Sequence, residues 1–131
     1  KAYILNVSST TAYQAVPTMN IYAASKSFVL LFTRALRYEL KHTSVSVSCL
    51  SPGGTKTNFV QRAKMPHMQK ISDRMSMEPD DVAATALRGM FAGKAEIIPG
   101  LVNKIGAVSA SLMPKALVEK IAAGLYVKKE K

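Results

Sequence analysis

The fold is decided by a stretch that begins Asn6-Val7-Ser8-Ser9 and, after a loop, ends Tyr22-Ala23-Ala24-Ser25-Lys26. Residues 1–7 form a short apolar run typical of a strand. A long helical pattern follows the loop over residues 21–42, and a second β-rich run occupies residues 45–50. A strand, a helix and a second strand in this order predict a right-handed βαβ unit of a parallel sheet.

Tyr22 and Lys26 are four residues apart, so on a helix they lie one above the other on the same face. A positive charge beside a phenol stabilises the phenolate, which favours proton exchange at neutral pH. Ser9 follows the first predicted strand, at the edge where open α/β sheets bind ligands. A hydroxyl there can hold a carbonyl oxygen beside the phenol. The three residues together predict carbonyl–alcohol redox chemistry. A tyrosine and a lysine at this spacing without the other features are more often a core tyrosine and a solvated lysine.

Three blocks of the sequence resemble the short-chain dehydrogenase/reductase family, and the resemblance covers about residues 1–100. They are Asn6-Val7-Ser8-Ser9, Tyr22 with Lys26, and Pro52-Gly53-Gly54-Thr55-Lys56-Thr57, and they stand in the order and at the separations of the family pattern. The resemblance implies an α/β fold, the C-terminal part of a Rossmann-like doubly wound parallel sheet with three strands and four to six helices. It also implies an NAD(P)-dependent oxidoreductase that interconverts a ketone and a secondary alcohol by hydride transfer.

The Gly-rich turn that receives the cofactor pyrophosphate in this family is not found among the seven glycines of the chain. We therefore expect residues 1–131 to be the C-terminal catalytic half of one Rossmann domain, with the N-terminal dinucleotide-binding half missing. Residues 1–131 alone are expected to be inactive. The cofactor is NADP or NAD, with NADP slightly favoured. The alternative is a catalytically inactive fragment that serves as a binding or membrane-associated module.

The resemblance assigns roles to individual residues. Ser9 would bind the substrate oxygen, Tyr22 would exchange the proton, and Lys26 would assist Tyr22 and contact the nicotinamide ribose. The catalytic residues are therefore Ser9, Tyr22 and Lys26; the cofactor-binding residues are Tyr22, Lys26, Pro52, Gly53, Thr55 and Thr57; and the substrate contacts are Ser9, Val16 and Met19. No metal is expected. The tail and loops look like the branch of 17β-hydroxysteroid dehydrogenases and 3-ketoacyl-CoA reductases, which implies a lipophilic ketone, steroid-like or 3-oxoacyl.

Composition narrows the class of protein. Hydrophobic residues make up 48% of the chain, which excludes a disordered tail. The single cysteine, Cys49, cannot form an internal disulfide and is expected to be buried, in keeping with a cytoplasmic location. The net charge of +10 comes without a basic run or a zinc-ligand spacing, so no nucleic-acid partner is expected. The sequence contains no run of 18 apolar residues, so a membrane-spanning helix is not expected.

The helix over residues 21–42 has an apolar arc wider than an ordinary surface helix needs. We expect the sheet to cover one part of the arc and a second copy of the chain another, in a homodimer or homotetramer; the alternative is deep burial within one subunit. The residues of the apolar arc are Ala24, Phe28, Val29, Leu31, Phe32, Ala35, Leu36 and Leu40. The basic residues Lys26, Arg34, Arg37 and Lys41 gather on the opposite side.

Residues 58–77 have weak periodicity and four methionines, which suits the substrate lid of the resembled family. His67 within it is expected to be an exposed loop histidine rather than a substrate contact. The tail, residues 101–131, reads as two helical pieces broken at Pro114, the second basic and amphipathic. It is expected to cap the substrate cleft or an oligomer interface, with peripheral membrane contact as the alternative. Its apolar and basic residues are Leu117, Val118, Ile121, Ala122, Leu125, Lys115, Lys120, Lys128 and Lys129.

Overall fold

The computed structural model describes residues 1–127, so Lys128 and Lys129 of the predicted basic tail lie outside the described residues. Three parallel strands form one sheet in the order β1-β2-β3, with β1 at Ala2–Val7, β2 at Val45–Leu50 and β3 at Glu96–Ile97. Six α-helices accompany them in the described part of the chain. The predicted α/β fold with three parallel strands and four to six helices is confirmed.

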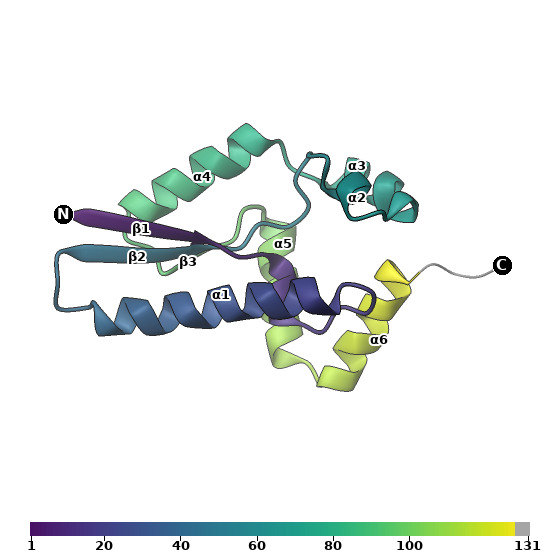
Figure 1. Cartoon of the computed structure of the whole chain (residues 1–131), viewed down its shortest axis with the longest axis horizontal. Helices are drawn as coiled ribbons and strands as arrows, with labels where there is room; N and C mark the ends of the chain where they lie inside the picture. Colours follow the sequence, from purple (N-terminus) through teal and green to yellow (C-terminus); the bar gives the residue numbers. More distant parts are fainter. Residues whose placement is uncertain (128–131) are drawn as a thin grey trace.

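Helices cover both faces of the sheet, as Figure 1 shows. Helix α1 (Asn20–Glu39) joins β1 to β2 on one face, and helix α4 (Pro79–Phe91) joins β2 to β3 on the other. The pairing runs from Ala2 opposite Val45 to Val7 opposite Leu50, so β1 and β2 end at the same edge. Segments that follow the two strands therefore meet at this edge.

Helix α4 packs on the sheet in the manner its sequence predicts. Pro79 begins the helix, Asp80 and Asp81 occupy the first turn, and Gly93 follows its end with φ +71°. Proline at the first position, acidic side chains near the N-terminus and a left-handed glycine after the C-terminus each favour a helix with these limits. On the face of α4 toward the sheet, Val82, Ala86 and Met90 pack against Leu50 of β2 and Ile97 of β3. These five residues form the larger core cluster.

Helix α1 corrects the predicted placement of its apolar arc. The sheet covers the opposite side of the helix, where Ala23, Leu30 and Thr33 are buried. Phe28 and Leu31, from the predicted arc, are 70% and 62% exposed. The predicted basic side instead reaches over the sheet, because long side chains can lie along it and bond to strand carbonyls. The helix also ends at Glu39 rather than at His42.

The remaining elements gather at the end of the sheet toward which the strands point (Figure 1). A 3-10 helix η1 (Thr10–Tyr13) follows β1. The lid region contains α2 (Phe59–Arg62), the 3-10 helix η2 (Pro66–Met68) and α3 (Gln69–Met75). The tail forms α5 (Leu101–Leu112) and α6 (Lys115–Tyr126), so the predicted break at Pro114 is confirmed. None of the helices within residues 1–127 is both long and apolar enough to cross a membrane.

Candidate active site

A cavity of about 410 Å³ lies beyond the C-terminal ends of the strands. Its walls come from the loop after β1, the start of α1, the turn after β2, the lid and α6. None of its lining residues is charged. The cavity brings together seven of the site residues predicted from sequence, which are Ser9, Met19, Tyr22, Pro52, Gly53, Thr55 and Thr57.

Ser9 lies at the start of η1, where it is the N-cap residue. Its Oγ accepts a hydrogen bond from the backbone N–H of Thr11 at 3.2 Å and so caps the short helix. The hydroxyl proton remains available to donate into the cavity. The neighbouring Ser8 Oγ donates to the carbonyl of Lys26 at 2.7 Å, which ties the end of β1 to α1.

Tyr22 and Lys26 lie on the same side of α1, as their spacing predicts. The Lys26 ammonium is 5.7 Å from the centroid of the Tyr22 ring. Its Nζ donates to the carbonyl of Val7 at 3.2 Å, so the charge is anchored at the last residue of β1. Tyr22 lines the cavity, whereas Lys26 lies behind it. The geometry places a fixed positive charge next to the phenol.

The turn after β2 is shaped by a close approach of α5. A Cβ added at Gly53 would lie 2.4 Å from Oδ1 of Asn103, so any larger residue here would require the Asn103 side chain to move. Asn103 is held in turn by a bond from its Nδ2 to the carbonyl of Pro99 at 2.9 Å. Thr55 pairs with Met77 in an isolated parallel bridge, which ties the turn to the end of the lid. The turn is therefore fixed from two sides.

Two residues of the loop before Tyr22 differ in their positions. Met19 lines the cavity, but Val16 is 1% exposed and lies outside it, packed with Met19, Ala23 and Met65 in the second core cluster. Val16 therefore supports the wall from behind. Thr18 between them has φ +71°, an uncommon conformation for a β-branched residue. This strained turn directs the chain into α1.

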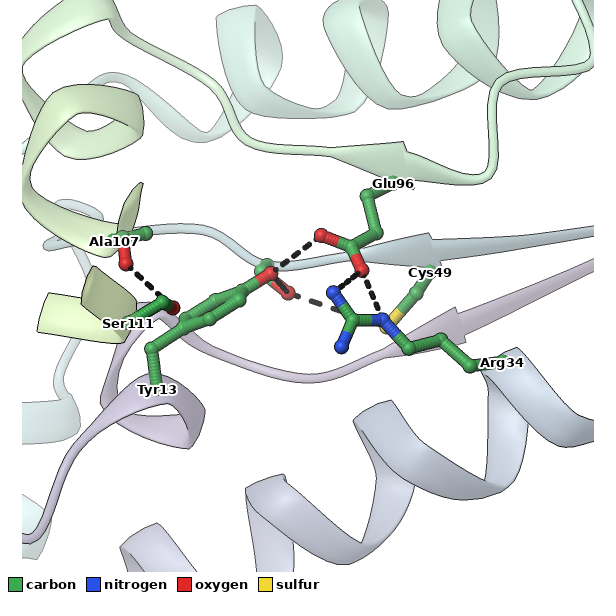
Figure 2. A network of polar contacts seen from close by, with 7 residues as sticks. Tyr13, Arg34, Cys49, Glu96, Ala107 and Ser111 are labelled. Carbon is green, nitrogen blue, oxygen red and sulfur yellow. Dashed lines mark hydrogen bonds and ion pairs between the residues drawn. The ribbon is translucent and has the colours of Figure 1, made fainter. Parts of the chain in front are cut away.

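A polar network fixes the loop that carries Ser9, and Figure 2 shows it from close by. Oη of Tyr13, at the end of η1, lies 3.1 Å from Oε2 of Glu96 and 3.3 Å from Oγ of Ser51. Glu96 also forms an ion pair with Arg34 of α1. Burial raises the pKa of Tyr13 to about 12, with the nearby Glu96 carboxylate adding to the rise. One phenol thus connects η1, the end of β2, β3 and α1.

The wall farthest from these residues is built by the lid and the tail. The sequence indicated these two segments, but it did not indicate which of their residues face the cavity. Methionine and aromatic side chains dominate this wall, so it is apolar and adaptable. The only signals in the sequence were the four lid methionines and the helical periodicity of the tail. His67 is exposed, as expected, and its Nε2 lies 3.0 Å from the carbonyl of Tyr126, which joins lid to tail. The residues of this wall are Phe59, Val60, Met65, Met68, Ser72, Met75, Ser76, Leu125 and Tyr126.

Cys49 is fully buried and free, as expected, and burial raises the pKa of its thiol. Among residues 1–127 there is no cluster of three or more histidine, cysteine, aspartate or glutamate side chains that could hold a metal ion.

The sequence of the chain is similar to those of known proteins. Residues 1–68, more than half of the chain, match the family described as short chain dehydrogenase. The chain belongs to the short chain dehydrogenase family. Its relatives include the protein SadH of Mycobacterium tuberculosis, an oxidoreductase by provisional assignment, which is 32% identical over 134 residues covering 94% of this chain and 48% of SadH. Dehydrogenase/reductase SDR family member 4 of Sus scrofa is 36% identical over 86 residues, or 61% of this chain and 31% of that protein.

Solved structures of short chain dehydrogenases share the fold. A solved structure that bears on the stereoselectivity of 7β-hydroxysteroid dehydrogenase superposes on this chain with a TM-score of 0.75 at 22% identity. The superposition covers 92% of this chain and 47% of the other. A Sphingobium yanoikuyae short-chain dehydrogenase in complex with NADPH superposes with a TM-score of 0.68 at 27% identity, over 83% and 42%. One from Burkholderia cenocepacia in complex with NADP has a TM-score of 0.69 at 22% identity, over 96% and 49%. The chain spans about half the length of the relatives and structures it matches.

Proposed function

We propose that the protein is an NADP- or NAD-dependent oxidoreductase that interconverts a lipophilic ketone and its secondary alcohol. The observation that carries the proposal is the convergence of Ser9 and Tyr22 on one cavity, with the Lys26 ammonium 5.7 Å from the Tyr22 ring. The apolar, uncharged lining beyond them favours a neutral, lipophilic substrate over a charged one, because burying an unpaired charge is costly.

In the proposed reaction Ser9 donates its hydroxyl proton in a hydrogen bond to the carbonyl oxygen and so fixes the substrate beside Tyr22. The Tyr22 hydroxyl gives its proton to that oxygen during reduction and takes it back during oxidation. The Lys26 ammonium stabilises the negative charge that develops on the phenol oxygen. Its bond to the carbonyl of Val7 holds the charge in place, so no reorganisation is needed as the proton moves.

The cavity also suits a nicotinamide ring. The Pro52–Thr57 segment supplies backbone groups and hydroxyls on one wall, and no charged side chain lines the space. Pro52, Gly53, Thr55 and Thr57 would hold the ring and its carboxamide, and Tyr22 and Lys26 would face the ribose. The bound cofactor would supply or accept the hydride. NADP remains only slightly favoured over NAD, since related structures include complexes with NADPH and NADP and one bound to NAD.

The test is Tyr22→Phe in the protein as its gene encodes it, with 4-phenylcyclohexanone as the ketone and NADPH or NADH as the reductant. Loss of the proton donor is expected to lower turnover by about 10²- to 10⁴-fold. The matched control is Tyr38→Phe, which removes an exposed hydroxyl from the same helix outside the cavity. Turnover of Tyr22→Phe equal to that of Tyr38→Phe would rule the assignment out.

We also propose that a second copy of the chain covers the outer face of α1, forming a homodimer or the core of a homotetramer. This face is apolar and open: Ile21, Phe28 and Leu31 are 83%, 70% and 62% exposed. Leu31→Glu is expected to yield monomers in light scattering, whereas Leu112→Glu, at an 81% exposed leucine of α5, should leave the mass unchanged. Equal masses for both variants would exclude this interface.

A further inference from the structure

The tail helix α6 contributes one polar side chain to the apolar wall of the cavity. Val118, Ala122 and Tyr126 are spaced by four residues and lie on the face of α6 turned toward the rest of the protein. Val118 and Ala122 are 5% and 1% exposed, and Tyr126 packs against the second core cluster. The Tyr126 side chain therefore points inward, and it lines the same cavity as Tyr22.

The position of Tyr126 is held from its backbone as well as its ring. Its carbonyl lies 3.0 Å from Nε2 of His67 in η2. Its ring packs on the cluster that contains Met19 and Met65, both of which also line the cavity. The lid and the start of α1 thus fix the phenol at a defined place on the wall.

The hydroxyl of Tyr126 is available to a ligand. Within residues 1–127 it has no hydrogen-bond partner, since the contact with His67 uses the backbone carbonyl. Burial raises the pKa of the Tyr126 phenol, and the nearby Tyr22 adds to the rise. The group is therefore neutral at physiological pH and can both donate and accept a hydrogen bond.

The neighbours of Tyr126 on this wall give its hydroxyl a specific use. Phe59, Val60, Met68 and Leu125 offer no strong hydrogen-bonding side chain. Ser72 and Ser76 of the lid also line the cavity, but their hydroxyls bond to each other at 3.1 Å. A polar atom of a ligand placed beside Tyr126 therefore has the phenol as a side-chain partner that no residue within 1–127 already occupies. Polar groups in an apolar pocket discriminate strongly between ligands that pair with them and ligands that do not. The cavity, at about 410 Å³, is of the size that small-molecule pockets occupy.

We propose that Tyr126 determines specificity by binding a second polar group, a hydroxyl or carbonyl, carried by an otherwise apolar ketone whose reacting carbonyl lies at Tyr22. The substrate class is thus a neutral, lipophilic, bifunctional ketone or alcohol. The inference rests on the proposed function for the placement of the reacting carbonyl. The polar group is recognised from the C-terminal tail, and the chemistry is performed by residues near β1 and α1.

The test uses two probes that differ in one hydroxyl, 4-phenylcyclohexanone and 4-(4-hydroxyphenyl)cyclohexanone. Their dissociation constants are measured by equilibrium dialysis for the protein as its gene encodes it, with oxidised NADP present so that no ketone is reduced. The wild type is expected to bind the hydroxylated probe about five- to tenfold more tightly, the worth of one added hydrogen bond. Tyr126→Phe should abolish this preference, because the hydroxylated probe loses its partner and then binds no more tightly than 4-phenylcyclohexanone.

Tyr38→Phe serves as the control, because Tyr38 is 68% exposed on α1 and does not line the cavity. It should retain the preference of the wild type. Equal binding of the two probes by the wild type, a preference that survives in Tyr126→Phe, or binding of neither probe would overturn the proposal. Because binding is measured without turnover, these outcomes are separate from the loss of activity expected for Tyr22→Phe.

Discussion

The two faces of the sheet are built in different ways. On the α4 face the contacts are apolar: Val82, Ala86 and Met90 pack against Leu50 and Ile97. On the α1 face polar groups cross between helix and strands. Asn6 Nδ2 donates to Oγ1 of Thr33 at 3.0 Å, Lys26 donates to the carbonyl of Val7, and Arg37 donates to the carbonyls of Val47 and Gly93.

The difference separates stability from chemistry. Apolar burial is the main favourable contribution to folding and has no directional requirement. Hydrogen bonds and buried cations contribute less net stability but hold atoms at defined positions. The α4 face therefore supports the sheet, and the α1 face orients two side chains of α1, Tyr22 in the wall of the cavity and Lys26 beside it. Four substitutions test this division, each in the protein as its gene encodes it.

The largest effect is expected from Lys26→Met on the α1 face. It removes the charge beside Tyr22 and keeps an apolar stem, so turnover should fall by about 10²-fold or more while the free energy of unfolding changes by less than about 1 kcal/mol. Turnover is measured by oxidation of the reduced nicotinamide cofactor. Lys41→Met, at an exposed lysine that lies 3.8 Å from the Tyr38 ring centroid, is the control. Similar turnover in both variants would contradict a chemical role for this face.

On the α4 face, Met90→Ala should act on stability alone. Met90 is 9% exposed in the larger core cluster, and its truncation leaves a cavity that lowers the free energy of unfolding by about 2–4 kcal/mol. Leu87→Ala, at a residue 47% exposed on the same helix, should cost about 1 kcal/mol or less in the same urea titration. If Met90→Ala lowered turnover of the folded protein as strongly as Lys26→Met, the division between the faces would fail.

Thr33→Val tests whether hydrogen bonds on the α1 face are needed at all. Thr33 is 1% exposed; its Oγ1 accepts from Asn6 and donates to the carbonyl of Val29 at 2.6 Å. Valine preserves the shape but leaves the Asn6 amide unpaired, so the free energy of unfolding should fall by about 1–2 kcal/mol. Ser111→Ala removes a bond of the same i−4 type, to the carbonyl of Ala107, from an exposed position. It should change stability by about 0.5 kcal/mol at most. A stabilised Thr33→Val would show that an apolar interface serves here equally well.

The smallest effect concerns Tyr13 and appears only at high pH. Its pKa is raised from 10.0 to about 12 because burial disfavours the phenolate. The folded state holds this proton more tightly than the unfolded state, so the contribution to stability is complete below pH 10 and is lost as the pH rises to about 12. The difference in urea midpoint between wild type and Tyr13→Phe should therefore shift against the wild type over this interval. An unchanged difference would mean that the Tyr13 phenol titrates alike in both states.

Much of the site could be predicted because its residues belong to short, local patterns. Tyr22 and Lys26 are one helical turn apart, and Ser9 and the Pro52–Thr57 turn each directly follow a strand. Parallel pairing then brings the strand ends together. The far wall could not be predicted in this way, because Met65, from the lid, and Tyr126, at the end of the tail, meet only through packing.

Helix sidedness was the other feature that sequence could not settle. The arc of Phe28 and Leu31 was identified correctly as apolar, but its exposure was not, because the sheet packs on the opposite side of α1. In α6 the residues Leu117 and Ile121 form a regular stripe, yet they are 45% and 50% exposed, and Val118 and Ala122 beside them are buried. Periodicity shows that a helix has two unlike sides, and it does not say what will cover each.

By itself the amino-acid sequence determined the order of strands and helices, the family, and the set of residues around Ser9, Tyr22 and Lys26. These depend on spacing along the chain, which backbone geometry converts directly into neighbouring positions. The tertiary structure alone decided that the basic side of α1 faces the sheet, that Val16 lies behind the cavity and that Tyr126 closes it. Those outcomes depend on which distant surfaces pack together, and packing is a property of the whole fold rather than of any one segment.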